Sequence, residues 1–178
     1  MAEAPLKRTE HGLEPEGEGW FVVNATEAPW VTATGLGRAC IFESREHEFS
    51  EVGINIHVIE PGEPNCMYHQ ENAQEGFLVL SGECLLIVEG EERRLRQWDY
   101  AHFPPGTRHV VVGAGDATAA VLMIGARKEP DEVLYPADPV ARRHGAAVDE
   151  DTGDQRRAYA HVEARGVEAY RPGDLPGA

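Results

Sequence analysis

The stretch GEPNCMYHQENAQEGFLVLSGE (residues 62–83), followed by WDYAHFPPGTRH (98–109), decides how this chain folds and where its chemistry lies. Together the two segments carry four side chains of the kind that bind divalent cations: His69, Glu71, Glu75 and His109. In a strand, residues two apart share a face, so the first two of these point the same way, and each of the others begins a following strand. We therefore expect the four side chains to meet if these strand starts are neighbours.

Such a donor set suits a metal ion. Two neutral imidazoles and two ionised carboxylates balance the charge of a divalent cation. Imidazole nitrogen suits zinc, iron and nickel, and carboxylate oxygen shifts the preference towards manganese and ferrous iron. Three or four protein ligands leave positions on an octahedral ion open, as in catalytic sites. The predicted cofactor is therefore a divalent ion (Zn, Fe, Mn or Ni), although the same pocket could hold a polar ligand by hydrogen bonds alone.

Eight strand-like runs follow one another through the middle of the chain, each bounded by turn residues. They are residues 38–44, 52–60, 75–83, 83–90, 92–98, 100–103, 108–113 and 117–126. Short strands with turns about every 8–12 residues, and with no helix between them, are typical of an antiparallel sandwich or barrel. The predicted fold class is therefore all-β.

The two quoted segments resemble the signature motifs of the cupin superfamily, G-x5-H-x-H-x3,4-E-x6-G and G-x5-P-x-G-x2-H-x3-N. The matching residues are Gly62, His69, Glu75 and Gly82 in the first motif and Pro104, Gly106 and His109 in the second. Glu71 stands where the second histidine usually is, and the spacing from Gly62 to His69 is one residue longer than the pattern.

This resemblance implies an antiparallel jelly-roll β-barrel in which His69, Glu75 and His109 hold the metal. Glu71 is then a fourth ligand or a catalytic base beside the ion. The resemblance also implies a homodimer and a metal-dependent enzyme of the dioxygenase, isomerase or epimerase, or decarboxylase type, in which the metal acts as a Lewis acid on a small polar metabolite. The alternative is a non-catalytic module that binds a sugar or a small acid.

Two further histidines are candidate catalytic residues. His57 shares a strand face with Asn55, and it contacts substrate or carries a proton if that polar face lines the cavity. His102, in AHFPPG, is a candidate general base, and the alternative is a packed or exposed histidine. Cys66 lies three residues before His69, so an extended strand would send its thiol to the opposite face.

The composition divides the chain into three parts. Residues 1–19 are rich in Glu, Gly and Pro and poor in aliphatic side chains, which predicts a disordered tail. Residues 20–126 hold the predicted β-barrel domain. Residues 127–178 form a C-terminal extension with Pro-Asp turns and short helices around 138–144 and 154–164.

The overall charge excludes several functions. A net charge of −15 over 178 residues repels the phosphates of nucleic acids and anionic membrane surfaces. No apolar run approaches the roughly 20 residues of a membrane span. The N-terminal segment lacks the apolar stretch of a signal peptide, so we expect a cytoplasmic protein. The predicted partners are a small-molecule ligand or substrate and a second copy of the chain.

Overall fold

Antiparallel β-structure makes up most of the chain. The computed structural model describes residues 2–44, 47–163 and 165–177. The strands are β1 (Leu6–Arg8), β2 (Leu13–Pro15), β3 (Trp30–Ala33), β4 (Leu36–Ile41), β5 (Val52–Ile59), β6 (Gln70–Glu71), β7 (Glu75–Ser81), β8 (Glu83–Val88), β9 (Glu91–Arg96), β10 (Tyr100–Phe103), β11 (His109–Ala114), β12 (Ala119–Ala126), β13 (Val133–Leu134) and β14 (Arg165–Glu168). The two helices are α1 (Pro139–Arg143) and α2 (Gln155–Ala158).

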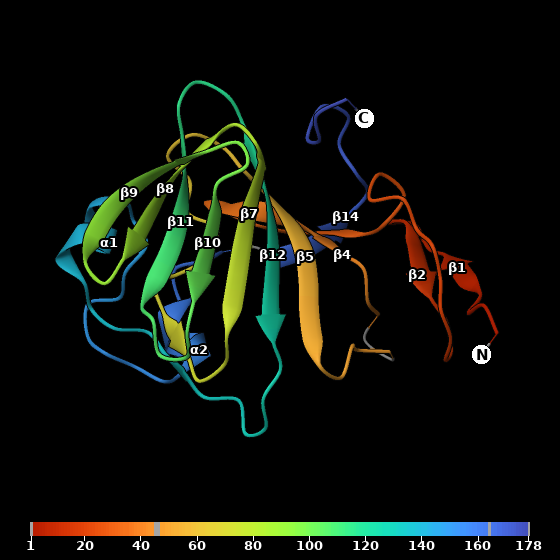
Figure 1. The fold of residues 1–178 in the computed structure, drawn as a ribbon, viewed down its shortest axis with the longest axis horizontal. Coiled ribbons are helices and arrows are strands. Elements are labelled where there is room, and N and C mark those ends of the chain that lie inside the picture. Colours follow the sequence, from red (N-terminus) through yellow and green to blue (C-terminus); the bar gives the residue numbers. More distant parts are fainter. Residues whose placement is uncertain (1, 45–46, 164, 178) are drawn as a thin grey trace.

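Two main sheets carry the fold (Figure 1). The larger sheet has the strand order β10-β7-β12-β5-β4-β3-β14, and the smaller has the order β11-β8-β9. Neighbouring strands in both are antiparallel. The prediction of an all-β antiparallel fold with a short helical C-terminal extension is confirmed. Among the described residues, the strand pairings form separate sheets and not one closed ring.

An apolar core lies between the two sheets, because alternate residues of each strand face inward. It contains Ile59, Phe77, Val79, Cys84, Leu86, Phe103, Val111, Ala119, Val121 and Met123. Strand β11 is buried on both faces. Val111 faces the core, whereas Val110 and Val112 pack with Ala141 of α1 and with Tyr68. The C-terminal extension thus covers the outer face of the smaller sheet.

Local sequence signals account well for the regular elements. The eight predicted runs correspond, in order, to strands β4, β5 and β7 to β12. Only β6, within this part of the chain, was not predicted. Helix α1 lies inside the predicted range 138–144, and its N-cap Asp138 accepts hydrogen bonds from two backbone N–H groups. Helix α2 is capped in the same way by Asp154 but ends at Ala158, well before residue 164. Neither described helix has the length and apolarity that a membrane crossing requires.

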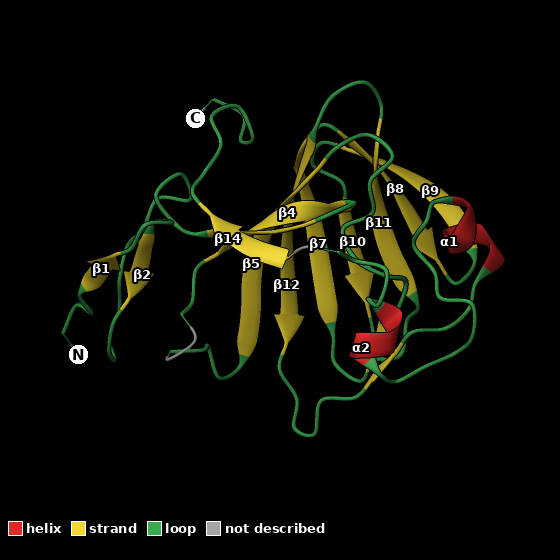
Figure 2. Ribbon diagram, turned by 180° about the vertical axis from the view of Figure 1, so that it is seen from behind, coloured by secondary structure: helices red, strands yellow, loops and turns green. Residues whose placement is uncertain are grey.

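The C-terminal extension is joined to the sheets by backbone pairing. Strand β13 pairs with β6, which carries Glu71, and β14 pairs with β3 and becomes the edge of the larger sheet. Both helices lie towards the end of the molecule that holds the smaller sheet (Figure 2). The extension therefore stands directly beside the predicted site.

The structure differs from the sequence prediction at residues 1–19, where it has the hairpin β1–β2 in place of disorder. The hairpin lies at the opposite end of the molecule from the helices (Figure 1). It is held by backbone contacts: the Leu13 N–H donates to the Glu27 carbonyl at 2.6 Å. Gly12 has a φ of +153°, and a Cβ there would lie 2.5 Å from the same carbonyl oxygen. The disorder was predicted from the low content of apolar residues. Such a prediction does not detect a segment that is ordered by backbone hydrogen bonds.

Candidate metal centre

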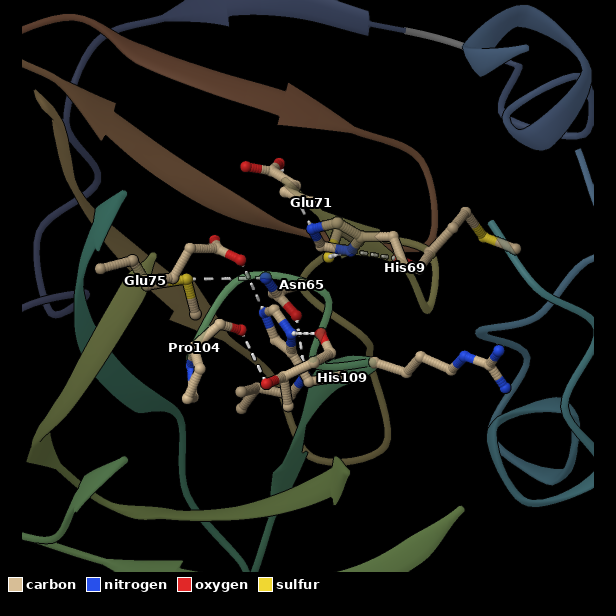
Figure 3. Close-up of polar contacts among 12 residues, drawn as sticks. Asn65, His69, Glu71, Glu75, Pro104 and His109 are labelled. Carbon is tan, nitrogen blue, oxygen red and sulfur yellow. Dashed lines mark hydrogen bonds and ion pairs between the residues drawn. The ribbon is translucent and has the colours of Figure 1, made fainter. Parts of the chain in front are cut away.

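Three of the four predicted ligands come together around one point (Figure 3). One ligand atom each from His69, Glu75 and His109 lie within 4.8 Å of one another. Backbone hydrogen bonds join the two histidines directly: the His69 N–H donates to the His109 carbonyl at 3.1 Å, and the His109 N–H donates to the His69 carbonyl at 2.8 Å. Glu75 enters from the start of β7. The two motif halves are thereby fixed to each other at their ligand positions.

Both histidines are oriented by a carbonyl two residues earlier. His69 Nδ1 lies 2.9 Å from the Met67 carbonyl oxygen, and His109 Nδ1 lies 3.0 Å from that of Thr107. A carbonyl only accepts, so in the neutral imidazole the hydrogen sits on Nδ1 and Nε2 keeps its lone pair. The two Nε2 atoms approach carboxylates of the site: His109 lies 3.3 Å from Glu75, and His69 lies 3.6 Å from Glu71. This is the ring orientation of metal-binding histidines.

Aromatic packing holds the ring of His109. The Phe103 ring stacks on it at 4.1 Å between centroids with planes 7° apart, and the edge of Phe77 meets it at 5.3 Å. His109 is only 1% exposed, and its Nε2 has no hydrogen-bond partner among the described residues. A buried polar atom without a partner costs about 1–3 kcal/mol. An ion bound at this nitrogen would remove that cost, so the donor set fits a metal.

The electrostatics of the cluster favour added positive charge. Burial, together with the nearby His69, lowers the pKa of His109 to about 4, so its imidazole is neutral. Burial and the charge of Glu71 raise the pKa of Glu75 to about 7. Burial opposes the charge on His69, but the Cys66 sulfur and the two carboxylates outweigh it and hold the pKa well above its usual value. His69 is therefore protonated, and its positive charge lies where a bound cation would lie.

Glu71 stands beside the cluster and not inside it. Its hydrogen bond with His69 lowers the pKa of the carboxyl, which is therefore ionised near neutral pH. The Glu71 side chain is 30% exposed, compared with 12% for Glu75. This position is compatible with either role expected for it, a fourth ligand or a base.

A cavity of about 660 Å³ opens from the cluster. His69, Glu71 and Glu75 line it, and Asn55 and His57 reach it from β5, as strand alternation predicts. Burial lowers the pKa of His57 to about 4, so this imidazole is also neutral. The candidate metal centre and His57 thus line the same cavity.

Two expectations from local spacing differ from the structure. The structure does not bring His102 to the cavity: it is exposed on β10, because its neighbours Ala101 and Phe103 face the core. Cys66 does line the cavity, and its Sγ lies 3.6 Å from His69 Nδ1. Alternation fails for Cys66 because regular strand geometry begins only at Gln70.

Several residues of the site were not predicted. Tyr135 and Tyr159 of the C-terminal extension form part of the cavity wall. The Tyr159 hydroxyl accepts a hydrogen bond from the Met67 N–H at 3.2 Å. Asn65 accepts a hydrogen bond from the Val111 N–H at 2.9 Å and so ties the motif segment to β11. These residues lie outside regular patterns, and only long-range contacts identify them.

Comparison with known proteins connects this site to a family. The profile of the cupin domain matches residues 55–125, which include all four predicted ligands. No functionally curated protein sequence matches the chain significantly.

Solved structures share parts of the fold. The polyketide cyclase RemF from Streptomyces resistomycificus is 15% identical over 62% of this chain and 80% of its own, with a TM-score of 0.50. A sugar phosphate isomerase from Silicibacter pomeroyi is 23% identical over 61% of this chain, with a TM-score of 0.49. A protein from Acidithiobacillus ferrooxidans, assigned provisionally as a sugar phosphate isomerase, is 32% identical over 47% of this chain, with a TM-score of 0.45.

The matched segments span 66% and 55% of the last two chains, less than two thirds of either. The segment matched by the profile, which contains most of strands β5 to β12, also contributes the core residues and the three clustered candidate ligands. Residues 55–125 thus match the cupin domain, and this segment holds the candidate metal centre.

Proposed function

We propose that this protein is a metal-dependent cupin enzyme that acts on a small polar metabolite. His69, Glu75 and His109 would hold a divalent ion (Zn, Fe, Mn or Ni) at the wall of the cavity. The observation that carries this proposal is the pair of carbonyl-oriented imidazoles that converge with the partly buried carboxylate of Glu75. The reaction is of the dioxygenase, isomerase or epimerase, or decarboxylase type.

The chain's own residues suit that chemistry. The cavity would shield part of a bound substrate from bulk water, which strengthens electrostatic interactions within it. Glu71 is an ionised carboxylate beside the cluster, and its lowered pKa suits a ligand better than a base. His57 is a neutral imidazole further along the cavity. A bound metal would supply Lewis acidity at the cluster.

A second candidate function is a non-catalytic module that binds a sugar or a small acid. The observation in its favour is the 3.6 Å contact between His69 and Glu71, in which a protonated imidazole and a carboxylate stabilise each other without an ion. The polar groups of the cavity could then hold a ligand by hydrogen bonds alone.

Metal content separates the two functions. We would measure it by elemental mass spectrometry after purification and after reloading with Zn²⁺, Fe²⁺, Mn²⁺ or Ni²⁺. Wild type is expected to bind about one ion per chain, and Glu75→Gln far less. Turnover that is abolished by a chelator supports the enzyme, whereas ligand binding that is indifferent to the chelator supports the module. An equal affinity of Glu75→Gln and wild type for the ion would contradict the proposed ligand set.

Glu71→Gln also distinguishes the roles of that carboxylate. If Glu71 is a ligand, the substitution weakens metal retention. If it is a base, metal retention is unchanged and turnover falls.

We further propose that the protein is a cytoplasmic homodimer.

A further inference from the structure

We propose that Asn55 and His57 form a hydroxyl-binding subsite, and that the molecule bound in the cavity is neutral and polyhydroxylated. This inference rests on the proposed function and adds a substrate class to it. The subsite is separate from the metal cluster, because both side chains come from β5, which contributes none of the candidate ligands.

Strand register places the subsite within reach of the cluster. Across β7, β12 and β5, one cross-strand row contains Glu75, Gly125 and Gly53. The next row on the same face of the sheet contains Phe77, Met123 and Asn55. His57 lies two residues further along β5. Neighbouring strands are about 4.8 Å apart, so Asn55 is roughly 10 Å from the strand that carries Glu75. A molecule of monosaccharide size spans that separation.

The glycine row leaves room for such a molecule. A Cβ on Gly125 would be 3.7 Å from Glu75 Cγ, and a Cβ on Gly53 would be 3.6 Å from Arg127 Nη2. Neither glycine carries a side chain between Glu75 and Asn55. At these two positions the wall between Glu75 and Asn55 is therefore backbone, with the side chains of Met123 and Arg127 beside it.

The two side chains of the subsite lack partners. Asn55 Oδ1 and His57 Nδ1 are buried and have no hydrogen-bond partner among the described residues. Both residues line the cavity, and a half-turn of the terminal amide or ring exchanges which polar atom faces it. Buried polar groups in proteins are usually paired, so these two groups require a partner from within the cavity.

The chemistry of the pair selects a hydroxyl group. An amide offers both a donor and an acceptor, and a neutral imidazole offers one of each. A hydroxyl group likewise donates and accepts, so it can satisfy either residue. Carboxylate and phosphate oxygens only accept and would leave the acceptor atoms of the subsite unpaired.

The charge of the cavity disfavours a phosphorylated ligand. Among the described residues that line it are five acidic side chains, Glu48, Glu71, Glu75, Glu129 and Asp131, and three that carry positive charge, Arg127, Lys128 and the protonated His69. Arg127 is already paired with Glu43 and Glu48. Phosphate recognition relies on free cationic or N–H groups, and this surface offers an excess of negative charge instead.

Ligand-binding measurements on matched variants test the subsite. The probes are neutral monosaccharides and myo-inositol, each compared with its monophosphate, and binding is measured by calorimetry and ligand-observed NMR at millimolar concentration. Wild type, Asn55→Leu, His57→Phe and the exposed control His102→Gln are compared, each with Zn²⁺ and after chelation. We expect a neutral probe to bind wild type and the control equally, and each subsite variant roughly tenfold more weakly.

Three outcomes would overturn the inference: unchanged affinity in both subsite variants, tighter binding of the phosphorylated probes, or no binding of any neutral probe. If circular dichroism shows that a variant is unfolded, Asn55→Ala and His57→Gln replace it. The zinc content of every sample is measured in parallel. Loss of zinc from wild type would contradict the proposed metal enzyme, whereas normal zinc content with phosphate preference would contradict only the subsite.

Discussion

At the scale of single residues, the candidate ligands are held by contacts that the motif does not contain. The motif predicts His69, Glu75 and His109, and the structure brings these three together. It does not predict the stacked ring of Phe103 or the carbonyl contacts that orient the imidazoles. The exposure of His102 follows from the register of β10, which places the residues on either side of it in the core.

Removing one imidazole tests the ligand set. His109→Gln is expected to lower the affinity for Zn²⁺ by at least about 100-fold, because even the loss of a group that only supports a ligand costs 10–100-fold. Competition with a chromophoric chelator measures the affinity. His102→Gln is the matched control, because that histidine is exposed on β10. Equal affinities in the two variants would remove His109 from the ligand set.

His57 makes folding stability depend on pH. Its pKa is about 4 in the folded chain, compared with the usual histidine value of 6.5 in an unfolded one. The unfolded state therefore binds more protons between these values, so this contribution to stability is complete above 6.5 and is lost as the pH falls towards 4.

The free energy of unfolding of wild type falls as the pH is lowered from 6.5 to 4. In His57→Phe this fall is expected to be smaller by up to about 3 kcal/mol. Urea denaturation of chelated protein, at a pH above 6.5 and at one near 4, measures the difference. An unchanged pH dependence in the variant would show that folding does not lower the pKa of His57.

At the scale of elements, the strands with regular alternation were predictable and the short ones were not. Strands β5 and β7 to β12 follow patterns that a local reading of the sequence detects. Strands β13 and β14 have two and four residues, and each pairs with a strand far away in sequence. Their extended state depends on the partner, so the local pattern carries no signal for it.

The C-terminal extension also supports the candidate metal centre through Tyr159. Arg165 lies 4.5 Å above the ring of Tyr159, whose hydroxyl accepts the Met67 N–H. The carbonyl of Met67 in turn holds His69 Nδ1 at 2.9 Å. Tyr159 is therefore a positioning residue for a candidate ligand.

Tyr159→Phe is expected to leave the buried Met67 N–H unpaired, at a cost of about 1–3 kcal/mol, and to weaken Zn²⁺ binding about fivefold. Chelator competition and urea denaturation are measured together, with Tyr100→Phe on the exposed side of β10 as the control. A loss of stability with unchanged zinc affinity would show that Tyr159 supports the fold and not the ligand.

At the scale of the whole molecule, the chain covers much of its own apolar surface. The segment 117–126 is apolar on both faces, which in the sequence suggests a partner. In the structure, Ala120 lies in a second buried cluster with Trp30, against which Tyr170 and Leu175 also pack. The exposed apolar residues that remain include Val31 and Val167, which face each other across β3 and β14.

We expect the protein in solution to have twice the chain mass of 19.5 kDa, measured by size-exclusion chromatography with light scattering. Val167→Lys, on the edge strand β14, is expected to shift it towards the monomer, because charge on an edge disfavours association. Glu63→Lys, away from that edge, is the matched control. A wild-type mass of 19.5 kDa would contradict the homodimer.

The tyrosine wall of the cavity comes from residues beyond 125, outside the segment that matches the cupin domain. The wall that meets a bound molecule can therefore change while the segment that carries the candidate ligands stays constant. Two proteins that align throughout 55–125 but differ in their tails would keep the same candidate metal site and present different walls around it.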